Sequence, residues 1–134
     1  MKRFILMLML VFGVSVMSFG QIQWYKTSEI SIRYLNKNTG YWTNWSDWEK
    51  CVVDVRFDLN NDVITIYSKN TQRYQVLELQ DPPYDSSGKQ VKFYVKDQDG
   101  DYGHIRLRIE NNGNSQLYVD FKDISWVYNV RRTS

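Results

Sequence analysis

Residues 103–130 read GHIRLRIENNGNSQLYVDFKDISWVYNV, and this stretch decides the fold. Apolar and polar side chains alternate in three successive runs, which are separated by residues 111–114 and 122–123. A period of two is typical of a β-strand with one buried and one wettable face. Asn, Asp and Gly tolerate the backbone angles of tight hairpins. The stretch therefore predicts three antiparallel strands joined by short turns.

The same alternation extends over the rest of the chain. It runs at residues 22–34, 51–59 and 91–96 and, in shorter form, at 63–68 and 73–79. Short connections cannot cross over a sheet, so consecutive strands must pair antiparallel. About eight strands in up-and-down order can satisfy their edges by closing into a barrel. We predict an all-β fold, in which a small closed antiparallel barrel is favoured over a two-sheet sandwich.

The composition excludes a disordered, collagenous or multi-span membrane chain. Of 134 residues, 43% are apolar, 16% aromatic and 24% charged, which is a globular balance. The chain has a single Cys, so no internal disulfide can form and packing must supply its stability. Cys51 is expected to be a small buried side chain.

The amino-terminal residues 1–20 have the three-part layout of a secretory signal peptide. Lys2 and Arg3 precede an apolar stretch of about eleven residues, which is too short to span a bilayer. Ser18 and Gly20 supply the small residues of a cleavage site. We expect cleavage near Gly20 and Gln21, which leaves residues 21–134 as one exported barrel domain, periplasmic or secreted and not membrane-spanning. The exported chain keeps 15 basic residues (17 − 2) against 15 acidic ones.

A Trp-rich segment at residues 41–51 reads YWTNWSDWEKC. Its three-residue Trp spacing resembles the ladder of thrombospondin type 1 repeats, in which indoles alternate with Arg side chains. The resemblance covers eleven residues and lacks the other cysteines, so we treat it as a coincidence. Either the segment plugs one end of the barrel, or its indoles form an exposed stacking platform for sugar rings or an aromatic partner. The equal charges weaken a third role at a membrane surface.

The whole exported chain resembles the calycin class of small barrels, which includes the lipocalins. Lipocalins begin with Gly-x-Trp on the first strand, and an Arg near the carboxyl end packs across that Trp. Trp24 and Arg131 or Arg132 stand in comparable places, with Ile22 instead of the Gly. In layout the chain also resembles small exported β-proteins of Gram-negative bacteria, including periplasmic lysozyme inhibitors. The resemblance implies a barrel that holds a small ligand.

Two functions follow, and neither is enzymatic. The first is a binding protein that holds a small apolar or amphipathic ligand in the barrel interior. Its candidate lining residues are Trp24, Ile32, Val55, Phe57, Phe93, Leu107, Val119 and Trp126. The alternative is surface recognition of a glycan or a protein partner, which includes an inhibitor-type role. Its candidate residues are Trp42, Trp45, Trp48 and Tyr84.

Other polar groups receive ordinary interpretations, and we predict no catalytic residue, metal or cofactor. Residues 97–101, which read DQDGD, lack the spacing of an EF-hand and are expected to form an acidic turn. His104 is interpreted as a solvated strand residue. An outward basic and aromatic stripe comprises Lys92, Tyr94, Lys96, Arg106, Arg108 and Tyr118. Glu78, Glu110 and Asp120 can neutralise it, so a nucleic-acid partner is not expected. We expect a monomer, or a homodimer if the barrel fails to close.

Overall fold

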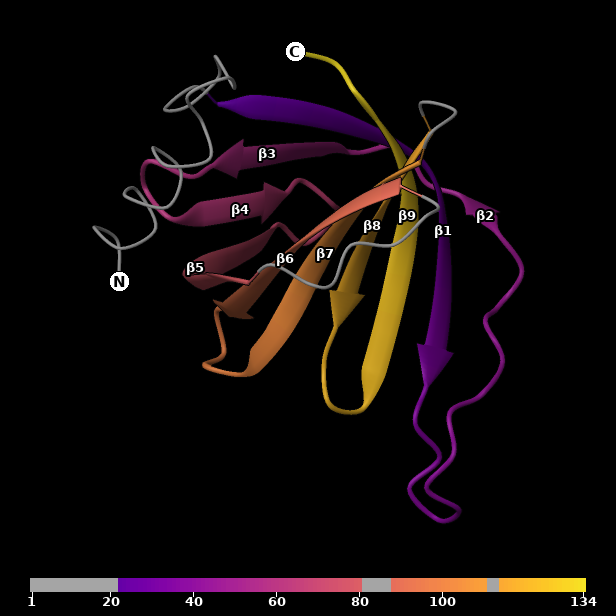
Figure 1. Cartoon of the computed structure of the whole chain (residues 1–134). Coiled ribbons are helices and arrows are strands. Elements are labelled where there is room, and N and C mark those ends of the chain that lie inside the picture. The colour runs from indigo at the N-terminus through magenta and orange to yellow at the C-terminus, as the bar shows by residue number, and fades with distance from the viewer. Residues whose placement is uncertain (1–21, 81–87, 111–113) are drawn as a thin grey trace.

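The computed structural model describes residues 22–80, 88–110 and 114–134. The expected signal peptide and Tyr84 lie outside these residues. The described chain is all-β (Figure 1). Its strands are β1 (Gln23–Tyr34), β2 (Glu49–Lys50), β3 (Asp54–Asp58), β4 (Val63–Ile66), β5 (Gln72–Gln80), β6 (Gly88–Lys96), β7 (Tyr102–Glu110), β8 (Ser115–Asp120) and β9 (Ile124–Arg132).

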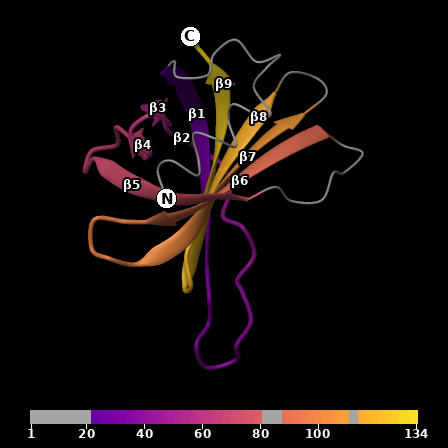
Figure 2. The ribbon, with the colours of Figure 1, turned by 60° about the vertical axis from the view of Figure 1, so that its left-hand side comes forward.

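Eight of these strands close into an antiparallel up-and-down barrel, as predicted. The hydrogen-bonded order is β1-β3-β4-β5-β6-β7-β8-β9, and β9 pairs back onto β1 from Tyr34↔Ile124 to Tyr25↔Arg132. Two open sheets would lack this last pairing, so the sandwich alternative is wrong. The two-residue β2 is an extra segment at the side of β1. Figure 2 shows the strands splayed around the barrel, with a hairpin that projects below it.

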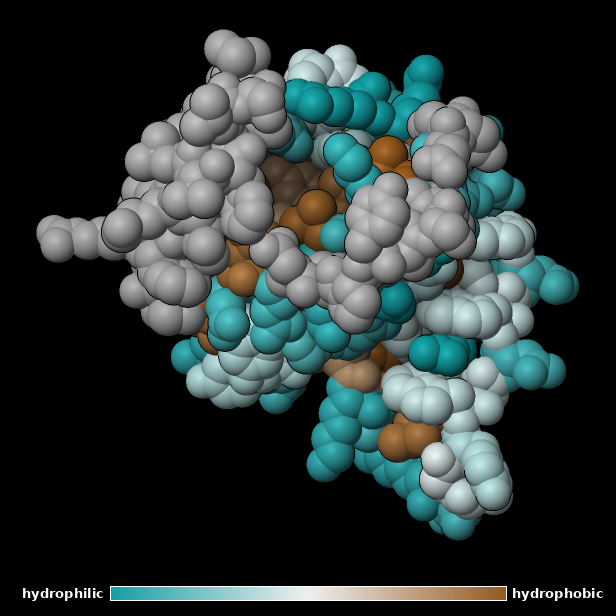
Figure 3. Space-filling view, viewed as in Figure 1, coloured by the Kyte–Doolittle hydropathy of each residue, from teal (hydrophilic) through white to brown (hydrophobic). Residues whose placement is uncertain are grey.

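The inward side chains fill the middle of the barrel, and hydrophobic residues (brown in Figure 3) are visible between the hydrophilic residues of its outer surface. Val55, Ile64, Val95, Ile105 and Val119 each have 0% of their surface exposed. A side chain that borders a cavity large enough for a water molecule keeps some accessible surface. These five side chains have none, so no such cavity lies beside them. The aromatic rings between them are also in contact, and the centroids of Tyr25 and Phe57, and of Phe57 and Phe93, lie 5.5 and 5.9 Å apart. The middle of the barrel is therefore a close-packed core.

A β-bulge in β1 decides which of its side chains face inward. The register against β9 shifts between Thr27 and Glu29. Before the shift, Tyr25 and Thr27 are buried; after it, Ile30 packs against the core. The Thr27 hydroxyl donates to the Cys51 carbonyl at 2.6 Å and accepts from the Val53 amide at 2.8 Å. These bonds hold the chain where the bulge interrupts the ladder.

Trp24 consequently lies on the outer face, and its assignment to the interior is wrong. Its ring stacks on that of Tyr67 with the centroids 6.0 Å apart. An Arg does lie over this ring, as in lipocalins, but it is Arg56 of β3, at 5.9 Å. Trp24 and Ile30 are both at even-numbered positions, with the polar Lys26 and Ser28 between them. Period alone therefore could not reveal that a bulge reverses the face between them.

The long connection after β1 is a hairpin that runs outside the barrel. The chain turns at residues 36–40, and residues 41–50, here called the return arm, come back along β1. The amides of Thr43 and Ser46 donate to the carbonyls of Tyr34 and Ile32, both at 2.8 Å. β1 therefore carries β9 on one side and, over its second half, the return arm on the other. Figure 1 shows this hairpin extending past the barrel end.

Candidate functional site

The Trp residues of the return arm lie over the outside of the barrel and do not plug its end. The guanidinium carbon of Arg33, on β1, lies 4.7 Å from the ring centroid of Trp42 and 4.6 Å from that of Trp45. One cation therefore contacts two indoles, which are held in place by the hydrogen bonds of the arm. Both indoles still expose 37% of their surface. The guanidinium comes from β1, whereas both indoles come from the return arm.

The layer continues onto the neighbouring strands. The ring of Trp45 meets the ring of Tyr118, on β8, edge-on with the centroids 6.2 Å apart. The guanidinium carbon of Arg106, on β7, lies 4.1 Å from the Tyr118 centroid. Its Nε donates to Asp120 at 2.6 Å, and Asp120 also accepts from the Ser125 hydroxyl at 2.5 Å. The outer layer is thus one connected set of contacts from the return arm to β7.

This outer layer buries side chains that the barrel itself leaves outside. Val127 and Ser125 of β9 and Ser31 of β1 face outward, yet they are only 2%, 1% and 1% exposed. The Ser31 hydroxyl donates to the Ser46 carbonyl of the return arm at 2.6 Å. The arm is therefore packed and hydrogen-bonded to the barrel, which makes its exposed indoles a fixed surface.

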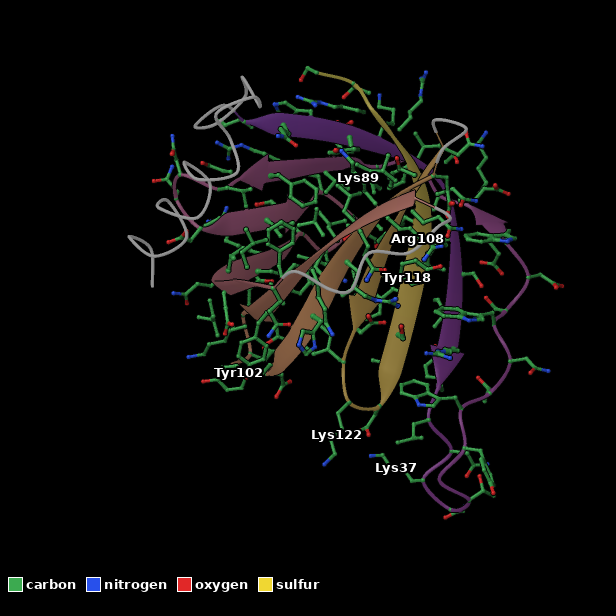
Figure 4. The ribbon with its side chains drawn as sticks, in the orientation of Figure 1. Lys37, Lys89, Tyr102, Arg108, Tyr118 and Lys122 are labelled. Atoms are coloured by element: carbon green, nitrogen blue, oxygen red, sulfur yellow. The ribbon has the colours of Figure 1, made fainter. Side chains whose placement is uncertain are left out.

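A cleft with a volume of about 380 Å³ lies beside Trp42. Its ionisable lining comprises Arg33, Lys92, His104, Arg106 and Asp120. Within the described residues these side chains come from β1, β6, β7 and β8, so strands far apart in the sequence build one site. In Figure 4, Tyr118 and the nearby Arg108 mark the same group of strands, and Lys37 and Lys122 mark the turns at their lower end.

The cleft carries an excess of positive charge. Three cationic side chains, Arg33, Lys92 and Arg106, face one carboxylate, Asp120. Burial, and next the positive charge of Lys92, lower the pKa of His104 below its usual value. The imidazole is therefore neutral at pH 7, and its environment disfavours adding a further positive charge. An anion is the group that this environment would stabilise.

A second cleft, of about 500 Å³, lies at the barrel end near the β6–β7 and β8–β9 turns. Its floor is aromatic, because the Phe121 ring stacks on Trp126 at 6.2 Å and tilts against Tyr74 at 6.1 Å. Phe121 fits there because Gly103 has no side chain; a Cβ would come within 2.8 Å of the ring. Burial raises the pKa of Tyr74, which stays a neutral phenol. These rings close the barrel end.

The acidic turn at residues 97–101 binds its own backbone. Asp97 Oδ1 accepts from the amides of Asp99 and Asp101, both at 2.9 Å. The Asp97 amide donates back to the Asp101 carbonyl at 2.8 Å. The segment is the β6–β7 hairpin turn that we expected. Among the residues that the structure describes, no group of three or more His, Cys, Asp or Glu could hold a metal ion.

The predicted interior residues fall into two groups besides the misplaced Trp24. Val55, Phe57, Phe93, Leu107 and Val119 are buried in the core. Ile32 and Trp126 pair with each other across β1 and β9 at the barrel end and stay half-buried. The set therefore does not converge on one open cavity.

The predicted surface residues are only partly brought together. Trp42 and Trp45 share Arg33, whereas Trp48 is 42% exposed and makes no ring contact with the described residues. The sequence reasoning missed Arg33, because an Arg at an outward strand position has no distinguishing signal of its own. The basic stripe and the Trp segment were each recognised, but the contact between them was not predicted.

No family model matches the chain, and no curated protein matches it in sequence. No helix in the described part of the chain has the length and apolar character needed to cross a membrane.

Proposed function

We propose that this chain is an exported, non-enzymatic binding protein that recognises a glycan through the indoles of Trp42 and Trp45. The observation that carries the proposal is their contact with Arg33, which fixes both rings on the outside of a rigid barrel while over a third of each stays exposed. Exposed Trp side chains combine a large apolar face with a polar tip, and sugar rings present a matching apolar face.

A fixed ring platform supports affinity because little conformational entropy is lost on binding. The return arm is hydrogen-bonded along β1 at Tyr34 and Ile32, and Ser31 ties its middle to the barrel. The rings are therefore already oriented before a ligand arrives. This favours a rigid, repeating ligand such as an oligosaccharide over a flexible partner segment.

The lipocalin-like alternative, a small apolar ligand in the interior, has weaker support. The middle of the barrel is close-packed, and the barrel-end cleft is floored by rings that contact each other. The barrel-end cleft is also lined by Asp97, Asp101 and Asp123, and an apolar ligand that covered these carboxylates would remove water from them at a cost in free energy.

Binding to an array of oligosaccharides, with the mature chain as probe, tests the proposal. Trp42→Ala and Trp45→Ala are expected to reduce binding at least tenfold, and the barrel should keep its circular dichroism spectrum. Trp48→Ala is the matched control, because it removes an equally exposed indole of the same arm that lacks the Arg33 contact. Equal loss of binding in all three variants would refute the proposal. It would also be refuted if the parent chain bound no glycan, or if it bound only a protein partner.

A further inference from the structure

We infer that the glycan bound at this face carries a carboxylate, as a uronic acid does, and that Lys92 and Arg106 bind that carboxylate in the cleft beside Trp42. This inference rests on the proposed function. It adds the chemical class of the ligand and two residues that the sequence reasoning assigned to a neutralised stripe.

The first step is an unfavourable pair that the fold keeps. Lys92 of β6 and Arg106 of β7 are directly opposite each other in the antiparallel ladder. Like charges in this position destabilise a sheet. Arg106 has Asp120 as a partner on its other side, but Lys92 forms no ion pair with any residue of the described chain. A bound anion between the two cations would remove this repulsion.

The second step is the unbalanced charge of Arg33, which also lines the cleft. Arg33 Nε is buried and has no hydrogen-bond partner in the described structure. Its guanidinium lies against two indoles, which bear no full negative charge. With Lys92 and Arg106 opposed only by Asp120, the cleft has a surplus of two positive charges (3 − 1). Charge-assisted hydrogen bonds to a carboxylate are among the strongest that such groups form.

The third step joins the charge to the platform. Trp42 lines the cleft and also contacts Arg33, so an anion held by Lys92 lies next to an indole face. A ligand that fills both places needs an apolar ring face and an acidic group on the same unit. An acidic sugar has this combination, whereas a neutral sugar leaves the cations without a counter-charge, and an inorganic anion leaves the indole uncovered.

Isothermal titration calorimetry at low salt provides the test. The probes are trigalacturonic acid and a hyaluronan tetrasaccharide, their methyl esters, and sodium sulfate. The esters keep the rings and remove the charge. We expect at least one of the two acidic oligosaccharides to bind, and to bind at least tenfold more tightly than its methyl ester. This preference should become smaller at high salt.

The variants separate the cleft from general surface charge. Lys92→Gln is expected to remove most of the preference for the acid over the ester. Lys96→Gln is the matched control. Lys96 lies on the outer face of the same strand, four residues after Lys92, where it contacts the Tyr102 ring and does not line the cleft. It should keep the preference.

Each failure has its own signature. Acid and ester bound equally well would overturn the carboxylate inference and leave glycan recognition standing. Binding of sulfate but of no sugar would overturn both, as would the absence of binding by every probe together with a blank glycan array. Equal losses in Lys92→Gln and Lys96→Gln would show that the overall charge of the surface, and not the cleft, selects the ligand.

Discussion

Replacement of Lys92 by Gln is expected to make the protein more stable. The residue is opposite Arg106 in the β6–β7 ladder and has no carboxylate partner in the described chain. Cross-strand pairs of this kind change stability by about 0.2–1 kcal/mol. Because a domain of this size gains about 4 °C in Tm per kcal/mol, the expected rise is roughly 1–4 °C. A rise in Tm would show that folding does not require the positive charge of Lys92.

The assay is thermal unfolding followed by circular dichroism at about 10 mM and about 1 M salt, where the Debye length falls from roughly 30 to 3 Å. The gain should be largest at low salt and vanish at high salt. Lys96→Gln provides the comparison: its Nζ lies 5.8 Å from the Tyr102 ring centroid, so its loss should leave Tm unchanged or slightly lower. A fall in Tm for Lys92→Gln at low salt, or a gain that persists at high salt, would refute the reasoning.

Three further changes test other parts of the structure. Proton NMR titration should give His104, the single imidazole of the chain, a pKa below 6.5, and Lys92→Gln should raise it by removing a neighbouring positive charge. As the pH falls below 6.5, the unfolded chain protonates His104 more readily than the folded chain does, so this residue lowers the free energy of unfolding. Denaturant titrations over a pH series should show that His104→Asn removes this contribution. Gly103→Ala should destabilise the barrel by about 1–3 kcal/mol in urea titration, because the new methyl group would come within 2.6 Å of the Asp120 carbonyl oxygen and 2.8 Å of the Phe121 ring. An unchanged midpoint would contradict the described packing. Thr27→Val keeps the side-chain shape but leaves the partly buried Cys51 carbonyl and Val53 amide without these bonds, so urea titration should show a loss of about 1–3 kcal/mol. A neutral result would mean that the bulge does not depend on them.

The strand pattern was predictable because each strand repeats one local rule. Alternation and short turns of Asn, Asp and Gly predict neighbours that pair in order, and closure follows when eight such strands must satisfy their edges. The β-bulge in β1, where Ser28 lies between the paired Thr27 and Glu29, was not predictable in the same way. A bulge inserts one residue without altering the composition of the strand, so the reversal of faces between Tyr25 and Ile30 could be recognised only from the register against β9.

The candidate site was predictable only in pieces. The Trp spacing and the basic stripe are each visible along the sequence, but their contact depends on how far β1 extends beyond its pairing with β3. Arg33 meets Trp42 and Trp45 only because the return arm folds back along that extension. Likewise, the opposition of Lys92 and Arg106 requires the register of β6 against β7, which turn length alone does not determine.

The pairing of β1 with β9, which closes the barrel, also determines how late in folding closure can occur. It joins residues about a hundred positions apart, as the hydrogen bond between Asn129 and Glu29, 100 residues away, illustrates. Contacts between such distant segments form slowly, because the entropy of closing the loop is lost before they contribute. A chain made from its amino terminus therefore holds its first strand without a partner on one side until the last strand arrives. The barrel therefore cannot close during synthesis before residues 124–132 have been made.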